Sequence, residues 1–146
     1  MSKLFAFRQE LATMIAAANI GFTEDNIIIK RQGDLWNDVA TGINASKDGV
    51  VLHIGIARGT STEEDSLEMD VTLPVTLIAL PQLVDGARPE EDLWEALVML
   101  MHDYRFENKP FSYRMKFQSF EDLEMQADDG TEYLGRQTEF KTHLSL

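Results

Sequence analysis

The sequence predicts an α+β protein in which two main helices pack on one face of a mainly antiparallel sheet. Two stretches with apolar residues three and four positions apart predict the helices, and stretches of strict alternation predict the strands. The elements follow in the order α-β-(α)-β-β-α-β-β. No linker, repeat or low-complexity tract divides the 146 residues, so residues 1–146 are expected to form a single domain.

The first helix is predicted over residues 3–18. Ser2 can cap its start, and Gly21 follows its end, where a left-handed residue often closes a helix. The apolar residues of one helix face are Leu4, Phe7, Leu11, Met14, Ile15 and Ala18.

The next two segments differ in how clearly the pattern defines them. Three β-branched residues in a row, Ile27-Ile28-Ile29, predict a short buried strand within residues 26–31. Residues 33–44 fit either a short helix with Asp34 near its start or a loop held by Trp36. The pattern leaves both alternatives open.

Two longer strands follow a turn at Lys47-Asp48-Gly49. The inward residues of the first strand are Val50, Leu52, Ile54 and Ile56. A polar, acidic loop over residues 59–66 connects it to the second strand. The second strand shows one apolar face, formed by Leu67, Met69, Val71, Leu73, Val75 and Leu77. Because Pro74 cannot donate a ladder hydrogen bond, this strand is expected to lie at an edge or to carry a bulge.

A second helix and a hairpin complete the chain. The helix opens at Pro89-Glu90-Glu91-Asp92 and should end before Pro110. Its apolar residues are Leu93, Trp94, Leu97, Leu100, Met101 and Tyr104. Alternation over residues 111–118 slips at Ser119-Phe120, which predicts a bulge, and Asp129-Gly130 is a good hairpin turn. The inward residues of the returning strand are Thr138, Phe140, Thr142, Leu144 and Leu146.

Composition narrows the function classes. The chain has no cysteine, so thiolate metal sites, disulfides and cysteine nucleophiles are excluded. The N-terminal residues lack the apolar core of a signal peptide, and no apolar run reaches the ~20 residues that span a bilayer, so we expect a cytoplasmic origin without membrane contact. The net charge of −12 disfavours general binding to nucleic acid.

Candidate catalytic and metal-binding groups are scattered. His53, His102 and His143 lie far apart in the sequence and form no metal-binding spacing. The acidic clusters fall in predicted loops or at a helix start, where water screens them. Since no nucleophile elbow or phosphate-binding glycine loop is present either, we expect no catalytic residue, metal or cofactor, and a protein that is not an enzyme.

The run from Glu63 to Leu77 is an acidic loop that feeds a long strand. A helix that begins Glu91-Asp92-Leu93-Trp94 follows, and the chain closes with a strand from Thr138 to Leu146. Over roughly residues 45–146, this order resembles the tail terminator proteins of long-tailed bacteriophages and related neck and tail-completion proteins. The resemblance implies a hexameric ring that caps the finished tail tube, stops its polymerisation and offers a surface for joining the head.

The same resemblance implies a location and a set of partners. The protein would be assembled in the host cytoplasm and lie at the tail–neck junction of the virion, in contact with further copies, the tail tube protein and head-connector proteins. DNA would pass through the lumen without specific binding. The residues expected to form subunit or partner contacts are Arg58, Glu63, Glu64, Asp65, Asp128, Asp129 and Arg136. Arg58 and Arg136 would make salt bridges between subunits.

Two alternatives belong to other classes. An acidic secretion chaperone, which binds a protein client as a dimer, has a similar length, but its pattern usually ends in a third helix rather than a strand. An enzyme built on His53 or His102 is the second alternative, although no spacing supports it. Oligomeric state separates a six-fold ring from a dimer, and a tightly bound small molecule or metal would favour the enzyme.

Overall fold

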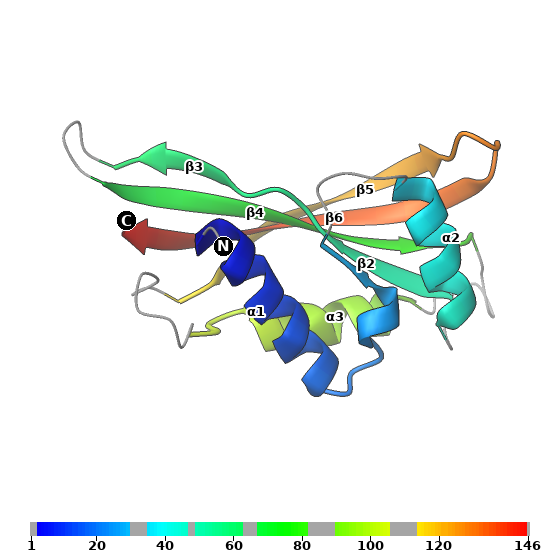
Figure 1. The fold of residues 1–146 in the computed structure, drawn as a ribbon, viewed down its shortest axis with the longest axis horizontal. Coiled ribbons are helices and arrows are strands. Elements are labelled where there is room, and N and C mark those ends of the chain that lie inside the picture. The colour runs from blue at the N-terminus through cyan, green and yellow to red at the C-terminus, as the bar shows by residue number, and fades with distance from the viewer. Residues whose placement is uncertain are drawn as a thin grey trace.

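The computed structural model describes residues 3–29, 35–46, 49–62, 67–81, 90–105 and 114–145. Over these residues it confirms the α+β prediction, with one mostly antiparallel sheet and three α-helices (Figure 1). The elements are α1 (Lys3–Ala17), the 3-10 helix η1 (Glu24–Asn26), β1 (Ile27–Ile28), α2 (Leu35–Ala45), β2 (Val50–Ile54), β3 (Arg58–Ser61), β4 (Glu68–Ala79), α3 (Glu90–Met101), β5 (Lys116–Gln126) and β6 (Glu132–Ser145).

The sheet is built around two long central strands. Its order is β1-β2-β4-β6-β5, and β3 pairs with the first part of β4, in line with β2. All neighbours are antiparallel except β1 and β2, which run parallel. The β4–β6 ladder joins twelve residues of each strand, from the pair Glu68–Ser145 to the pair Ala79–Leu134. This ladder gives the molecule its long axis (Figure 1).

The two main helices, α1 and α3, cover the same face of the sheet, as predicted. Side chains of α1 and α3 share one core with alternate residues of the strands, and its members include Phe7, Leu11, Ile15, Val71, Leu73, Leu97, Met101 and Phe140. The undecided segment at residues 33–44 forms α2, which covers the opposite face at the β1–β2 end of the sheet. There Val39 and Ile43 pack with Ile28, Val51 and Ile78 in a second cluster. Among the described helices, none is long and apolar enough to cross a membrane.

The strand that contains Pro74 departs from both alternatives predicted for it. The edge position is wrong, because β4 is paired on both sides, and β4 itself carries no bulge, because its pairing with β6 runs without a register shift. The bulge lies instead in the segment opposite Pro74, between β2 and β3: residues 55–57 face residues 73–74, between the pairs Ile54–Val75 and Arg58–Thr72. The break suits a residue that has no N–H for the ladder. Because Ile56 lies in this bulge, it is 54% exposed instead of inward-facing.

The terminal hairpin follows its prediction closely. Its register shifts between Phe117 and Ser119, which confirms the predicted bulge. The turn holds Gly130 at φ +88°, a left-handed value that favours glycine. Alternation in β6 buries Thr138, Phe140, Thr142 and Leu144. Several predictions lie outside the described residues, namely those for Ser2, Asp34, residues 63–65, Pro89, Pro110, residues 111–113 and Leu146.

Candidate binding site

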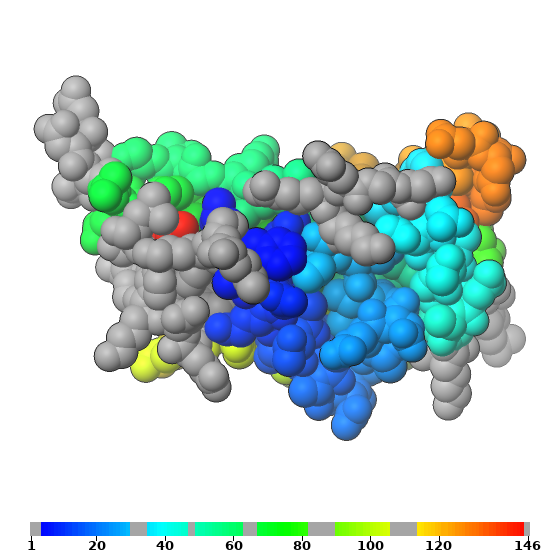
Figure 2. All heavy atoms as spheres, in the orientation of Figure 1, coloured from blue at the N-terminus to red at the C-terminus, as the bar shows by residue number. Residues whose placement is uncertain are grey.

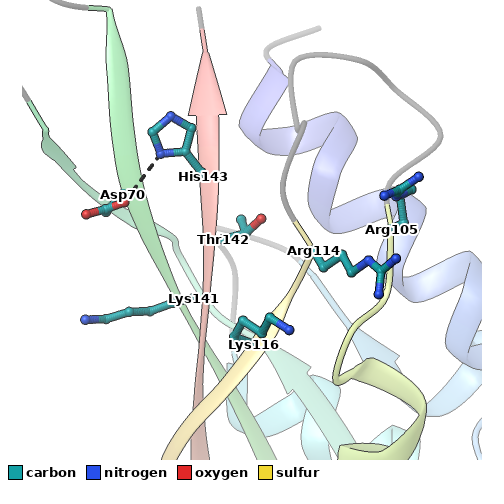
Figure 3. Close-up of a pocket in the computed structure, with 7 residues that line it drawn as sticks. All are labelled: Asp70, Arg105, Arg114, Lys116, Lys141, Thr142 and His143. Carbon is teal, nitrogen blue, oxygen red and sulfur yellow. Dashed lines mark hydrogen bonds and ion pairs between the residues drawn. The ribbon is translucent and has the colours of Figure 1, made fainter.

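A pocket of about 580 Å³ opens where β5 begins beside the end of β6 (Figure 3). Four of its seven lining residues are cationic. We call this site the basic pocket and define it by Arg105, Arg114, Lys116, Lys141, Thr142, His143 and Asp70. It gathers four of the 13 lysines and arginines of a chain whose net charge is −12. Four cationic side chains therefore lie together in a molecule that is acidic as a whole.

Backbone hydrogen bonds bring the two arginines of the basic pocket together. The N–H of Met115 donates to the carbonyl of Tyr104 over 2.9 Å, and the N–H of Asp103 donates to the carbonyl of Met115 over 2.7 Å. These bonds hold the chain after α3 against the chain before β5, so that Arg105 and Arg114 become neighbours. Figure 3 draws both arginines on the same side of β6, while Lys141 extends away on the other side.

Charge in the basic pocket is only partly compensated by the protein. Lys116 forms an ion pair with Asp103, and this hydrogen bond is the main cause that lowers the pKa of Asp103. His143 Nδ1 lies 3.4 Å from Asp70 Oδ1. Arg105, Arg114 and Lys141 are exposed and form no ion pair with a described residue, although Arg114 also lowers the pKa of Asp103 from a longer distance.

Cationic groups of this kind bind carboxylates and phosphates. A guanidinium presents parallel N–H donors that match both anions. The basic pocket is therefore a candidate site for an anionic partner.

The opposite end of the same hairpin is acidic. Four exposed carboxylates lie here, with no basic residue between positions 117 and 135, and we call this end the acidic turn: Glu124, Asp128, Asp129 and Glu132. Figure 2 shows the turn between β5 and β6, in orange, at one end of the molecule. Figure 1 places the C-terminus, near the basic pocket, at the other end. The basic pocket and the acidic turn thus lie at opposite ends of the elongated molecule.

Hydrogen bonds fix the conformation of the acidic turn. The N–H of Ala127 donates to the carbonyl of Thr131 over 2.9 Å, and the N–H of Gly130 donates to the carbonyl of Ala127 over 3.0 Å. Asp129 Oδ1 accepts a hydrogen bond from the N–H of Thr131 over 2.9 Å, which lowers the pKa of Asp129. Asp129 is therefore used inside the turn, whereas Asp128 has no hydrogen bond or ion pair with a described residue.

The structure places Arg136, a predicted contact residue, in a cluster of side chains from its own chain. Its guanidinium bonds Asp122 at 2.7 and 3.1 Å and Glu91 at 3.3 Å. The same group lies 4.7 Å from the ring centroid of Trp94 and 4.8 Å from that of Phe120. The hydrogen bond to Asp122 is the main cause that raises the pKa of Arg136. Only 11% of its side chain is exposed.

The remaining predicted contact residues lie apart from this cluster. Arg58, on β3, pairs with Glu139 at 3.0 Å and keeps 70% of its side chain exposed. Asp128 and Asp129 lie in the acidic turn. Residues 63–65 lie outside the described part of the chain. The described predicted residues therefore do not form one site, and their role between subunits stays a prediction.

The basic pocket was not predicted from the sequence. Arg114 and Lys116 fall in the strand predicted over residues 111–118, and Arg105 falls in the helix predicted to end before Pro110. The signal in the sequence was weak: three of the 13 basic residues fall between positions 105 and 116 in addition to Lys109. Only the backbone pairing of residues 103–104 with Met115 reveals that they converge.

The three histidines do not converge. His53 lies on β2, and burial together with the nearby charge of Arg8 lowers its pKa. His102 Nδ1 accepts a hydrogen bond from the N–H of Phe117 over 3.0 Å. Within the described residues, no three histidine or carboxylate side chains are grouped in a way that could hold a metal ion.

No protein-family model and no curated protein matches this chain. The likeness to tail terminator proteins therefore stays a prediction.

Proposed function

We propose that this protein is a non-catalytic structural subunit that assembles head to tail into a closed ring, like the phage tail terminator and neck proteins that its sequence resembles. One observation carries the proposal: the basic pocket and the acidic turn lie at opposite ends of an elongated subunit. Two different, complementary surfaces are what a head-to-tail interface requires, and such interfaces form rings when the rotation between subunits closes.

A symmetric contact through β5 is less favourable. This strand of eleven residues forms one edge of the sheet, and its regular part follows the bulge. If two copies of β5 pair antiparallel with two-fold symmetry along this regular part, the symmetry axis passes beside Asp122 or beside Leu123. In the first case Asp122 lies opposite Asp122 of the second copy, and in the second case it lies opposite Glu124 of the second copy. Like charges directly opposite each other destabilise a strand pair, and the bulge protects the edge further.

The overall charge supports the role that the resemblance implies. A net charge of −12 per subunit would let DNA pass through the lumen of a ring without being held there. In the proposed role the ring caps the tail tube at the tail–neck junction and offers its other side to head-connector proteins.

The mass of the purified protein in solution, followed by negative-stain images, tests the proposal. Six chains of 16.5 kDa, about 99 kDa together, with a central hole in the images, would support it. A stable dimer would favour the chaperone alternative. A monomer that binds a small molecule tightly would favour the enzyme and contradict the proposal.

A further inference from the structure

We infer that the basic pocket of one copy receives the acidic turn of the next copy, and that the carboxylate of Asp128 meets the paired guanidinium groups of Arg105 and Arg114. This inference rests on the proposed function, because it names the partner of the basic pocket within the ring. It goes beyond that function by assigning the two halves of the subunit contact.

The structure distinguishes the two neighbouring aspartates of the turn. Asp129 holds the turn closed through its hydrogen bond to the N–H of Thr131. Asp128 is exposed at the tip and has no polar partner among the described residues. Because Asp129 already fixes the turn, Asp128 is presented in a defined position. A group that is positioned before binding loses less conformational entropy when it binds.

The basic pocket is suited to such a carboxylate. Arg105 and Arg114 come from two segments that backbone hydrogen bonds tie together, so the two backbone positions are held close to each other before binding. Lys116 is held by Asp103 and supplies less free charge. A volume of about 580 Å³ can accept several side chains of a turn rather than a single ion.

The source of the anion follows from the charge of the whole molecule. A nucleic acid would approach a protein of net charge −12, whose field repels phosphate at long range. The acidic turn of a second copy brings only a local group of carboxylates. In addition, every copy carries both halves of this contact, so each added subunit satisfies one basic pocket and offers another.

Charge reversal on each side tests the inference. Arg114→Glu and Asp128→Arg should each weaken self-association about tenfold or more, as measured by light scattering over a concentration series. The double variant that carries both changes should recover most of the wild-type assembly. Glu95→Lys reverses an exposed charge outside the basic pocket and the acidic turn, and it should leave assembly close to wild type. Thermal melts check that all four variants are folded.

The outcomes separate this inference from the proposed function. If the wild type assembles and both single reversals assemble equally well, the inference is wrong while the ring proposal stands. If the wild type never assembles, both are wrong. An oligonucleotide of 20 bases, added as a probe, should not bind; binding that Arg114→Glu abolishes would show that the basic pocket serves phosphate instead.

Discussion

The N–H of Gly55 donates a hydrogen bond of 2.8 Å to the carbonyl of Pro74, at the one place where the ladder beside β4 is interrupted. Proline removes a backbone donor on this side of β4, and the bulge that starts at Gly55 accommodates the loss. The close approach leaves no room for a side chain: a Cβ on Gly55 would lie 2.9 Å from Pro74 Cγ and 3.1 Å from its carbonyl oxygen.

Gly55→Ala should therefore destabilise the fold. We expect the free energy of unfolding to fall by about 1–3 kcal/mol, because the new methyl group overpacks against a rigid ring and a backbone oxygen. Gly59→Ala is the matched control, since its Cβ would meet chiefly the flexible thioether of Met69. Urea titrations of both variants measure the difference. Equal stability of the two would contradict the role assigned to the Gly55–Pro74 contact.

The two arginines predicted to bridge subunits should differ in their effect on the fold. Arg136→Ala should lower the free energy of unfolding by about 1–2 kcal/mol, because Arg136 lies between two aromatic rings and two carboxylates and is largely buried. Arg58→Ala removes an exposed ion pair and should change the free energy of unfolding by less than about 0.5 kcal/mol. Chemical denaturation measures the free energy of unfolding of both variants. A larger loss for Arg58→Ala would refute this ranking.

His53 should make stability depend on pH. Burial and Arg8 disfavour the charged imidazole in the folded state, so its folded pKa lies below the ordinary value of 6.5. The unfolded chain then takes up a proton at a higher pH than the folded chain does. Stability is therefore full above pH 6.5, falls as the pH drops below it, and levels off below the folded pKa. His53→Gln should make the melting temperature depend less on pH in this range. An unchanged pH dependence would contradict the role assigned to His53.

The neighbouring aspartates of the acidic turn should separate stability from assembly. Asp129→Ala removes the acceptor for the N–H of Thr131 and should lower the urea midpoint. Asp128→Ala leaves that bond intact, so it should weaken self-association without moving the midpoint. Denaturation and light scattering on the same two proteins give both values. The opposite pattern would mean that the roles of the two residues are exchanged.

Local patterns were sufficient to predict the main elements. Alternation predicted β4 and β6, because alternate residues of each strand are buried in the core that α1 and α3 share. The position of α2 was not predictable in the same way. Its side chains pack on Ile28, Val51 and Ile78, which come from three different strands, and single-segment periodicity does not contain that information. The same limit explains why Pro74 was placed at an edge.

The candidate site depended even more on tertiary structure. Asp128 and Asp129 were recognisable as a turn because Asp-Gly favours one. Arg105 and Arg114 are nine positions apart in the sequence and become neighbours only through the pairing of Tyr104 with Met115. The partners of Arg136, Asp122 and Glu91, are likewise set by strand register and by the docking of α3.

The mass of the purified protein at low and high salt tests the central claim most directly. The account predicts particles of about six 16.5 kDa chains at low salt, which dissociate as salt screens the exposed charges of the basic pocket and the acidic turn. A mass of 16.5 kDa at every concentration, or a salt-resistant dimer of about 33 kDa, would contradict head-to-tail assembly through these two surfaces.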